Sequence, residues 1–460
     1  MVKLAKYLKP FAAAICLSVL LLFGQAMCDL NLPNLMSDLV DVGIQQGGIE
    51  SAAPEAMSRQ GMELLSLGLS PQEEEIWKGA YQEVLPESEQ AKTLVEQYPL
   101  LNTEPIYLKK DLTREQEETA ELLAGRAAYA LMQAKQQASG LQSQEVNSVS
   151  ELLQAVEKLP EQQLEEIRLS CENVPESTLR QTGISLSKLL YQDLGTDVAQ
   201  IQSSYMVNKG LQMLLVALLG GLATVSVSFL AARIGAGLAR NLRRDIFEKV
   251  ESFSSSEFDH FSTASLITRT TNDVTQIQML ATMGLRMLCY APIMGIGGVI
   301  MALNTSVSMS WVIGLAVLLL ITMAAVIFKI AMPKFKTMQK LIDKMNLVAR
   351  ENLSGLMVIR AFGTENFEKD RFDATNRNLA GTQRFVNRVM IFMLPAMMLI
   401  MNCSSLLVVW VGSEQIARSA LQVGDMMAFI QYAMHVIMSF LFISMMFIMV
   451  PRASVSAERI

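Results

Sequence analysis

Three polar side chains recur every four residues in an apolar run near the end of the chain: Gln431, His435 and Ser439. Residues four apart lie on one face of an α-helix, so this face can hydrogen-bond a guest molecule or a neighbouring helix. The imidazole could also change charge near neutral pH, and packing between helices is the alternative interpretation of His435. This chemistry is non-covalent, because the sequence shows no catalytic triad, metal-ligand spacing or nucleotide-binding motif.

Other polar residues are scattered through the apolar runs. Such residues are costly in hydrocarbon and tend to face a cavity or a partner helix. A candidate substrate path therefore contains Arg286, Asn402, Gln431, His435, Met438 and Ser439. Methionine is common, at 31 residues, and its flexible thioether suits apolar guests of varied shape. Filling between helices or contact with lipid is the alternative interpretation of the methionines.

Two short segments combine aromatic rings with charged neighbours. The first tip comprises residues 257–261 and the second tip comprises residues 364–372. An aromatic anchor surrounded by charge suits a groove on a soluble partner, although two solvated hairpins are the alternative. The candidate docking residues are Glu257, Phe258, Asp259, His260, Phe261, Thr364, Glu365, Asn366, Phe367, Glu368 and Arg371.

The elements that position these residues are apolar and long. Only 18% of the 460 residues are charged and the mean hydropathy is +0.31, whereas soluble domains carry about 25% charge. Six stretches approach or exceed the roughly 18 residues that span a bilayer. They begin near Phe11, Leu211, Leu280, Met309, Val389 and Met426. We expect an all-α polytopic membrane protein with six transmembrane helices, the first retained and covering residues 11–28.

Charge is divided unevenly along the chain. Residues 29–209 hold 13 basic and 29 acidic residues, a net charge of −16, whereas the rest has a net charge of +10. The loop 329–388 holds 12 basic and 6 acidic residues, and short loops rich in Lys and Arg stay in the cytoplasm. The pattern predicts a cell-membrane protein with both termini cytoplasmic and residues 29–209 extracytoplasmic.

The acidic segment carries helix-start signals. Ser70, Thr113 and Ser148 each precede a Glu or Gln by three residues, as in a capping box, and prolines divide the segment into short helices. A solvated helical cap is one interpretation, and a domain that receives a substrate or partner is the other. Cys28 and Cys171 could both face an oxidising compartment, but their spacing neither requires nor excludes a disulfide.

Two cytoplasmic hairpins are expected to carry the tips. Helix-favouring sequence continues from Leu211 to Phe253, which at 1.5 Å per residue is roughly 60 Å and twice the hydrocarbon thickness. Residues 254–256 interrupt it before a return helix. The second hairpin descends over residues 329–361, is interrupted at 363–365 and returns over 367–388, and we expect Pro333 to kink its descending arm.

At these hairpins the sequence resembles the transmembrane domain of ABC exporters of the multidrug type. The resemblance lies in residues 240–278, 351–378 and 450–460, together with 29–47, which are similar to the outer extension of the first span in bacterial members. It implies coupling helices at 258–262 and 364–371 that seat on ATPase domains. It also implies that Arg269, Asp273, Arg360 and Arg371 stiffen the hairpins, with solvated helix faces as the alternative.

The resemblance divides the chain into three parts. Residues 1–49 form the first span and its extension, 50–205 an insertion of about 155 residues that is unusual for the family, and 206–460 the other five spans with the coupling loops. The family's ATPase domain is expected either beyond a truncated end or on a separate polypeptide, because no GxxxxGK[ST] phosphate loop is present.

The resemblance further implies the partners. These are an ABC ATPase domain that holds ATP and Mg, a second half-transporter that is identical or different, and membrane lipids, with no nucleic acid and no cofactor on this chain. The implied function is ATP-driven export by alternating access of an amphipathic drug, lipid or peptide. A membrane sensor or scaffold, whose outer domain binds a ligand and signals through the loops, is the alternative.

Overall fold

The computed structural model describes residues 5–88, 91–139, 148–171, 174–254, 257 and 261–460. The chain divides into two compact units. The membrane unit comprises Met1–Leu30, Leu219–Trp410 and Phe429–Ile460, and the insert unit comprises Asn31–Leu218 and Val411–Ala428.

Six helical segments are long and apolar enough to cross a bilayer, as the sequence predicts. In the described part of the chain they are Lys6–Gln45, Val198–Glu251, Thr263–Thr305, Val307–Ser354, Glu365–Ala417 and Val423–Arg459. A helix is the natural spanning form, because every backbone N–H and C=O inside hydrocarbon must be hydrogen-bonded within the segment. The predicted all-α polytopic architecture is confirmed.

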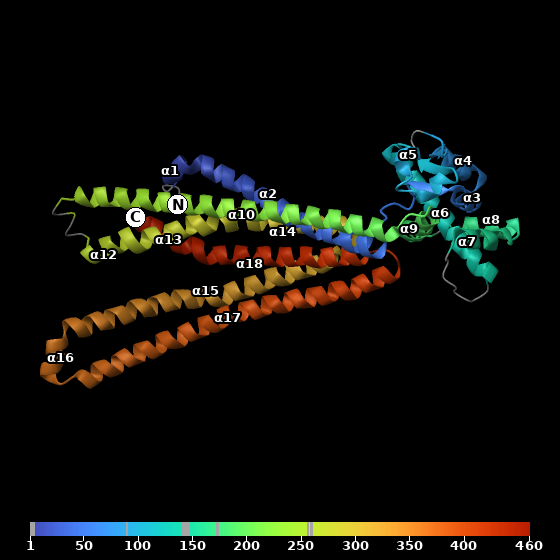
Figure 1. The fold of residues 1–460 in the computed structure, drawn as a ribbon. Helices are drawn as coiled ribbons and strands as arrows, with labels where there is room; N and C mark the ends of the chain where they lie inside the picture. The colour runs from blue at the N-terminus through green and yellow to red at the C-terminus, as the bar shows by residue number, and fades with distance from the viewer. Residues whose placement is uncertain (1–4, 89–90, 140–147, 172–173, 255–256, 258–260) are drawn as a thin grey trace. The chain divides into compact units, whose positions relative to one another are not determined.

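Figure 1 colours the helices in chain order, from blue at the N-terminus to red at the C-terminus. The first and second spans contain α1 (Ala5–Leu8), η2 (Lys9–Phe11), α2 (Ala12–Asp38), η3 (Leu39–Gln45) and α10 (Val198–Glu251). The third contains α12 (Thr263–Thr268), η6 (Arg269–Asp273), α13 (Val274–Met279), η7 (Leu280–Gly284) and α14 (Leu285–Thr305). The last three contain η8 (Val307–Met309), α15 (Ser310–Ser354), α16 (Leu356–Phe362), α17 (Glu365–Ala417) and α18 (Val423–Arg459). The π-helical segments η3, η6 and η7 were not predicted.

The first hairpin has α10 as its descending arm. Its return arm begins with α12 and continues through η6 and α13. α10 has 54 residues, which at 1.5 Å per residue is about 80 Å, so it extends far beyond the hydrocarbon of a bilayer. It ends at Glu251, close to the expected end at Phe253. Ser262 begins the return by accepting a hydrogen bond from the backbone N–H of Ser265.

The second hairpin differs from the prediction in its descending arm. The expectation of one helix over residues 329–361 is wrong: α15 ends at Ser354, and α16 begins after Gly355. Glycine is about 1 kcal/mol less favourable than alanine in a helix interior, which makes residue 355 a weak point. Gly363 then ends α16 with φ of +63°, a conformation that favours glycine. α15 stays helical through Pro333.

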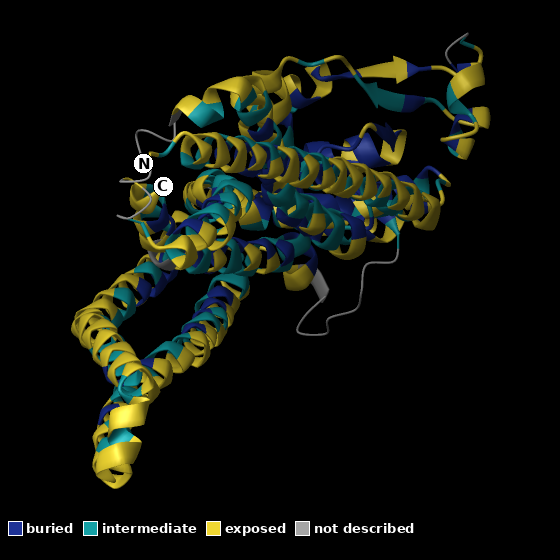
Figure 2. Cartoon of the chain, turned by 90° about the vertical axis from the view of Figure 1, so that its left-hand side faces the viewer, coloured by how far each residue is buried: buried dark blue, intermediate teal, exposed yellow. Residues whose placement is uncertain are grey.

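The membrane unit leaves much of the second hairpin uncovered. The long hairpin at the lower left of Figure 2 is coloured exposed or intermediate over most of its length. α15, α17 and α18 do meet in one apolar cluster around Leu320, Met397 and Ile437. Several of the abundant methionines therefore fill space between helices, since Met323, Met393 and Met401 pack against the same cluster.

The insert unit contains a small sheet that was not predicted. β1 (Ala56–Ser58), β2 (Tyr81–Val84) and β3 (Ile106–Lys109) pair antiparallel in the order β1-β3-β2. Strands of three or four residues are too short to display a clear period of two. The helices of this unit are α3 (Arg59–Leu67), α4 (Pro71–Gly79), α5 (Ala91–Leu94), η4 (Pro99–Asn102), α6 (Arg114–Ser139), α7 (Val149–Glu157), α8 (Glu161–Ser170) and α9 (Glu176–Asp193).

Two helix caps in the insert unit form where the sequence predicts them. Ser70 and Glu73 make a full capping box at the start of α4, and Ser148 accepts from the backbone N–H of Glu151. The core centres on the fully buried Trp77 and on one face of α6. Cys171 is buried, and both it and Cys28 are free thiols.

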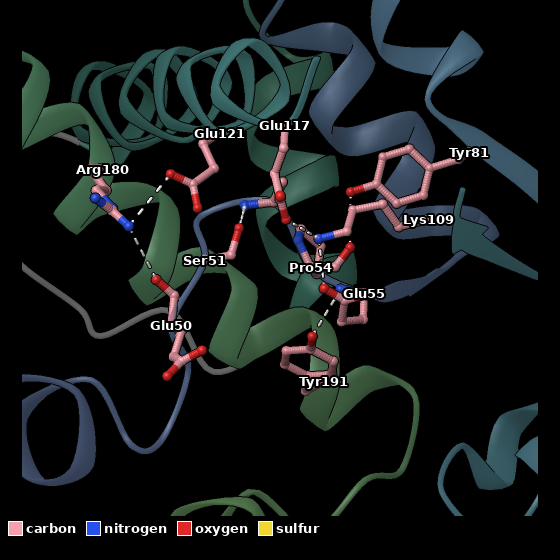
Figure 3. Close-up of polar contacts among 11 residues, drawn as sticks. Glu50, Ser51, Pro54, Glu55, Tyr81, Lys109, Glu117, Glu121, Arg180 and Tyr191 are labelled. Atoms are coloured by element: carbon pink, nitrogen blue, oxygen red, sulfur yellow. Dashed lines mark hydrogen bonds and ion pairs between the residues drawn. The ribbon is translucent and has the colours of Figure 1, made fainter. Parts of the chain in front are cut away.

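A polar network anchors the segment that precedes β1 (Figure 3). Tyr191 accepts a hydrogen bond from the backbone N–H of Glu55 at 2.9 Å, and Tyr81 donates to the carbonyl of Pro54 at 2.8 Å. Lys109 pairs with Glu55 at 2.5 Å and Glu117 at 3.3 Å. Burial alone would lower the pKa of Lys109, but contact with these two carboxylates outweighs burial and raises it.

Close contact between α6 and α9 yields the first prediction. A Cβ at Gly125 would lie 2.8 Å from the backbone of Leu179, so Gly125→Ala should weaken α6 by about 1–3 kcal/mol, the usual cost of overpacking. Hydrogen–deuterium exchange of the α6 amides in the full chain measures this loss. The control is Gly79→Ala, because no atom lies within 4 Å of its added Cβ. Equal protection in both variants would contradict the packing.

Candidate functional site

The first tip is organised by a stack of three side chains. The rings of Phe253 and Phe261 lie 5.6 Å apart at an interplanar angle of 14°, and the guanidinium of Arg269 lies 5.0 Å from the centre of the Phe261 ring. Arg269 thus links the return arm of the hairpin to its tip by a cation–π contact. Phe258, Asp259 and His260 lie outside the described residues.

Glu257 closes the turn that leads into the first tip. Its carboxylate accepts hydrogen bonds from the backbone N–H of Ser254 at 2.7 Å and from the Ser254 hydroxyl at 2.9 Å. Contact with these donors lowers the pKa of Glu257. The Glu257 side chain therefore stabilises the turn through its two hydrogen bonds with Ser254.

Asp273 connects the first hairpin to the last helix. The side chain is 4% exposed, and its Oδ1 accepts a hydrogen bond from the Ser456 hydroxyl at 2.8 Å. Around it, Leu238, Val274 and Ile277 form an apolar cluster against which Tyr7 and Ala457 pack. Asp273 therefore fastens the third span to α18.

The second tip starts at the left-handed turn of Gly363. The Thr364 N–H donates to the carbonyl of Ile359 at 3.1 Å, and its carbonyl accepts from the N–H of Glu368 at 3.2 Å. Glu365 and Asn366 occupy the exposed first turn of α17. Arg360, on α16, is exposed.

Arg371 joins the two arms of the second hairpin. Its guanidinium lies 2.7 Å from Glu351 near the end of α15 and 3.4 Å from Glu368 on its own helix. Both partners are accessible to water, and ion pairs between exposed side chains contribute little to stability. The contact with Glu351 bridges the two arms beside the tip.

Large apolar side chains are exposed at and beside the second tip. Met357 is 80% exposed, Phe362 79% and Phe367 68%. Exposed apolar residues gathered in one place indicate a contact surface. The second tip thus carries exposed apolar side chains at the end of a long helical hairpin.

The six candidate path residues lie on three helices. Arg286 on α14, Asn402 on α17, and Gln431 and Met438 on α18 are exposed, whereas His435 is half-buried and Ser439 buried. Within the described residues, no hydrogen bond or ion pair joins any two of them. Ser439 faces α14, because a Cβ at Gly295 would lie 2.6 Å from its hydroxyl.

A polar contact near the end of the first predicted span was missed. α2 continues past Cys28, and Asp29 Oδ2 accepts a hydrogen bond from the Tyr290 hydroxyl at 2.6 Å and from the amide of Gln25 at 3.4 Å. The spacing of four between Gln25 and Asp29 was a usable signal. The hydrogen bond with Tyr290 could not be inferred from the sequence, because the two residues are 261 positions apart.

A second missed contact lies in the insert unit, at the start of α18. Asp41 is 4% exposed. Its Oδ1 accepts from the N–H of Gly424 at 2.7 Å, and its Oδ2 from the N–H of Asp425 and the hydroxyl of Ser37, both at 3.2 Å. Free N–H groups at a helix start favour such a carboxylate. Residue 424 must be small, because a Cβ there would lie 2.5 Å from Asp41.

Comparison with known proteins gives the family. The model of the ABC transporter transmembrane region matches residues 191–440, which is more than half of the chain and includes both tips. The chain belongs to this family. The expected membership is confirmed, and with its six apolar helices this ABC transporter region is a multi-pass membrane protein.

The relatives of this ABC transporter region are ATP-binding proteins by name. An uncharacterized ABC transporter ATP-binding protein of Mycobacterium tuberculosis is 38% identical over 263 residues, covering 57% of this chain and 45% of the relative. The uncharacterized ABC transporter ATP-binding protein YfiB of Bacillus subtilis is 33% identical, with coverages of 51% and 41%. The multidrug resistance-like ATP-binding protein MdlA of Buchnera aphidicola is 27% identical, with coverages of 48% and 39%. The matched part thus spans less than half the length of these relatives.

The Asp41 contact yields the second prediction. We expect Asp41→Ala in this ABC transporter region to destabilise the start of α18 by about 1–2 kcal/mol, the cost of losing a helix cap. Asp41→Asn retains one oxygen acceptor and should lose less. The melting midpoint in detergent compares the variants, and identical midpoints for wild type and Asp41→Ala would show that the cap contributes nothing.

Proposed function

We propose that this chain is the transmembrane part of an ATP-driven ABC exporter. The observation that carries the proposal is the exposed apolar surface of the second tip, held at the end of a long helical hairpin in a chain of the ABC transporter transmembrane region family. The names of the relatives support an ATP-binding partner segment. ATP and Mg would be held by that ATPase domain, and the described residues of this chain would bind neither.

The two tips would receive the ATPase domain. Phe367 would enter a groove on its surface, while Arg371 and Glu351 hold the angle of the hairpin. At the first tip, the stack of Phe253, Phe261 and Arg269 would present a second docking point. Helices of 54 and 53 residues would carry a displacement of the tips into the spans, and so alternate access to the pathway.

A second half-transporter would complete the pathway. α15 and α17 carry exposed apolar residues along their length, among them Leu318, Ile321, Phe392 and Leu406. Part of this surface would face lipid and part would pack on the other half, identical or different. Amphipathic drugs, lipids or peptides are the substrates we propose, because Met398 and Met438 offer exposed thioethers on α17 and α18.

Docking through Phe367 is the third prediction. Phe367→Ala should weaken binding of an ABC ATPase domain roughly tenfold, because an aromatic anchor is worth about 1–2 kcal/mol or more at an interface. The dissociation constant is measured with the chain in lipid nanodiscs and the ATP-binding segment of the mycobacterial relative as a soluble partner. Phe392→Ala is the control, because Phe392 lies on the same helix and is 65% exposed, close to the 68% of Phe367. Equal affinities of the two variants would contradict docking at the second tip.

Orientation in the membrane is the fourth prediction. We propose that the tips and both termini are cytoplasmic and that residues 29–209 are extracytoplasmic, because the loop between the fourth and fifth spans is rich in Lys and Arg. In a cysteine-free chain, Glu165→Cys should react with an impermeant maleimide on intact cells, and Asp370→Cys only after permeabilisation. Both side chains are exposed. The reverse pattern would overturn the orientation and with it the docking of a cytoplasmic ATPase.

A further inference from the structure

The insert unit contains two adjoining cavities that the transport proposal does not use. The larger has a volume of about 540 Å³ and the smaller about 190 Å³. Arg180, Gln422 and Asp425 line both of them. The larger cavity has the size of sites that hold small organic molecules, roughly 300–1,000 Å³.

The walls of both cavities are strongly acidic. The carboxylates that line them belong to Asp38, Asp41, Glu50, Glu118, Glu121, Glu176 and Asp425. Against these seven, Arg180 is the one basic residue among the lining residues that the structure describes, and it lies 3.5 Å from Glu121 (Figure 3). Lys209 does not line the cavities, but its ammonium forms an ion pair with Asp38 at 3.0 Å and offsets that negative charge. The net charge left in the cavities favours a cation.

The larger cavity is also apolar. Leu122, Leu179 and Ile184 from the insertion line it. So do Ile416 near the end of α17, Leu421 in the loop that follows and Val423 at the start of α18. A small hydrated cation gains nothing from such side chains. In the described part of the chain, no group of three or more His, Cys, Asp or Glu is placed to hold a metal ion. The lining instead suits an organic cation with an apolar body.

The smaller cavity is lined by one side chain with an unpaired hydrogen-bond acceptor. Gln46 lines it, and the side-chain carbonyl oxygen of Gln46 is buried without a partner among the described residues. A buried acceptor without a donor is unfavourable, because its lost hydrogen bonds to water are not replaced. The N–H groups of a bound ammonium would satisfy it, with the carboxylates of Glu50 and Asp425 in the same lining.

We infer that these cavities form a binding site for an organic amine, with its ammonium group in the smaller cavity and its apolar body in the larger. The site belongs to the insert unit and acts by binding alone. It does not depend on an ATPase domain or on transport, so each proposal can fail without the other.

The test is a fluorescence titration of the full chain in lipid nanodiscs. The probe is dansylcadaverine, a primary ammonium on an aromatic body, and the comparison is its N-acetylated form, which keeps the body and removes the charge. Empty nanodiscs measure the background from lipid. We expect the charged probe to bind about tenfold or more tightly than the acetylated one, and its affinity to fall as salt is raised.

Variants identify the site. Glu176→Gln combined with Asp425→Asn should weaken binding roughly tenfold, because two partly exposed charges are lost. Glu161→Gln combined with Glu165→Gln removes the same charge from α8, outside the cavities, and should leave binding unchanged. Arg180→Gln should tighten binding several-fold, because it removes the lining cation and frees Glu121, and a poorly folded variant would not gain affinity.

Three outcomes would overturn the inference. The first is equal affinity for the charged and acetylated probes, which would mean partition into apolar surface. The second is an equal loss in the cavity variant and the α8 control, which would mean a general effect of net charge. The third is weaker binding of the charged probe by Arg180→Gln, which would mean that this arginine supports the ligand and does not oppose its charge.

Discussion

A backbone that crosses hydrocarbon must satisfy its own hydrogen bonds, and this constraint shapes most of the molecule. Each span is a helix because no other single segment meets that condition. The helices then continue past the membrane, since α10 holds no proline and α15 accommodates Pro333. A single continuous helix is the simplest rigid extension from a membrane, because each residue adds about 1.5 Å along one axis. The tips owe their position to this continuity.

Polar contacts between helices add a second constraint. In the insert unit, Asp41 caps α18, and Asp38 pairs with Lys209 of α10. In the membrane unit, Asp273 accepts a hydrogen bond from Ser456, and Asp29 accepts one from Tyr290. Each contact joins spans that are distant in sequence through a buried or half-buried acid. Apolar packing between spans tolerates sliding, whereas a hydrogen bond to one atom sets the register.

Much of the architecture was predictable because its signals are local. Hydropathy located six spans, and the spacing of Ser70 and Glu73 located the start of α4. Gly363 marked the turn of the second hairpin because few other residues adopt a positive φ. The break at Gly355 was missed, since one glycine in a favourable helical context does not by itself decide between a break and a continuous helix. The three short strands were missed because each gains its stability from its neighbours in the sheet.

The sequence alone determined the membrane class, the six spans, the two hairpins with their aromatic tips, and the resemblance that the family match confirmed. All of these depend on composition, periodicity or contiguous motifs, which are properties of neighbouring residues. Only the tertiary structure decided that Asp29 meets Tyr290, 261 residues away, and that Asp41 meets Gly424, 383 residues away. It also decided which acids line the cavities of the insert unit. Spacing along a chain carries no record of such pairs, because they form only when separate helices pack.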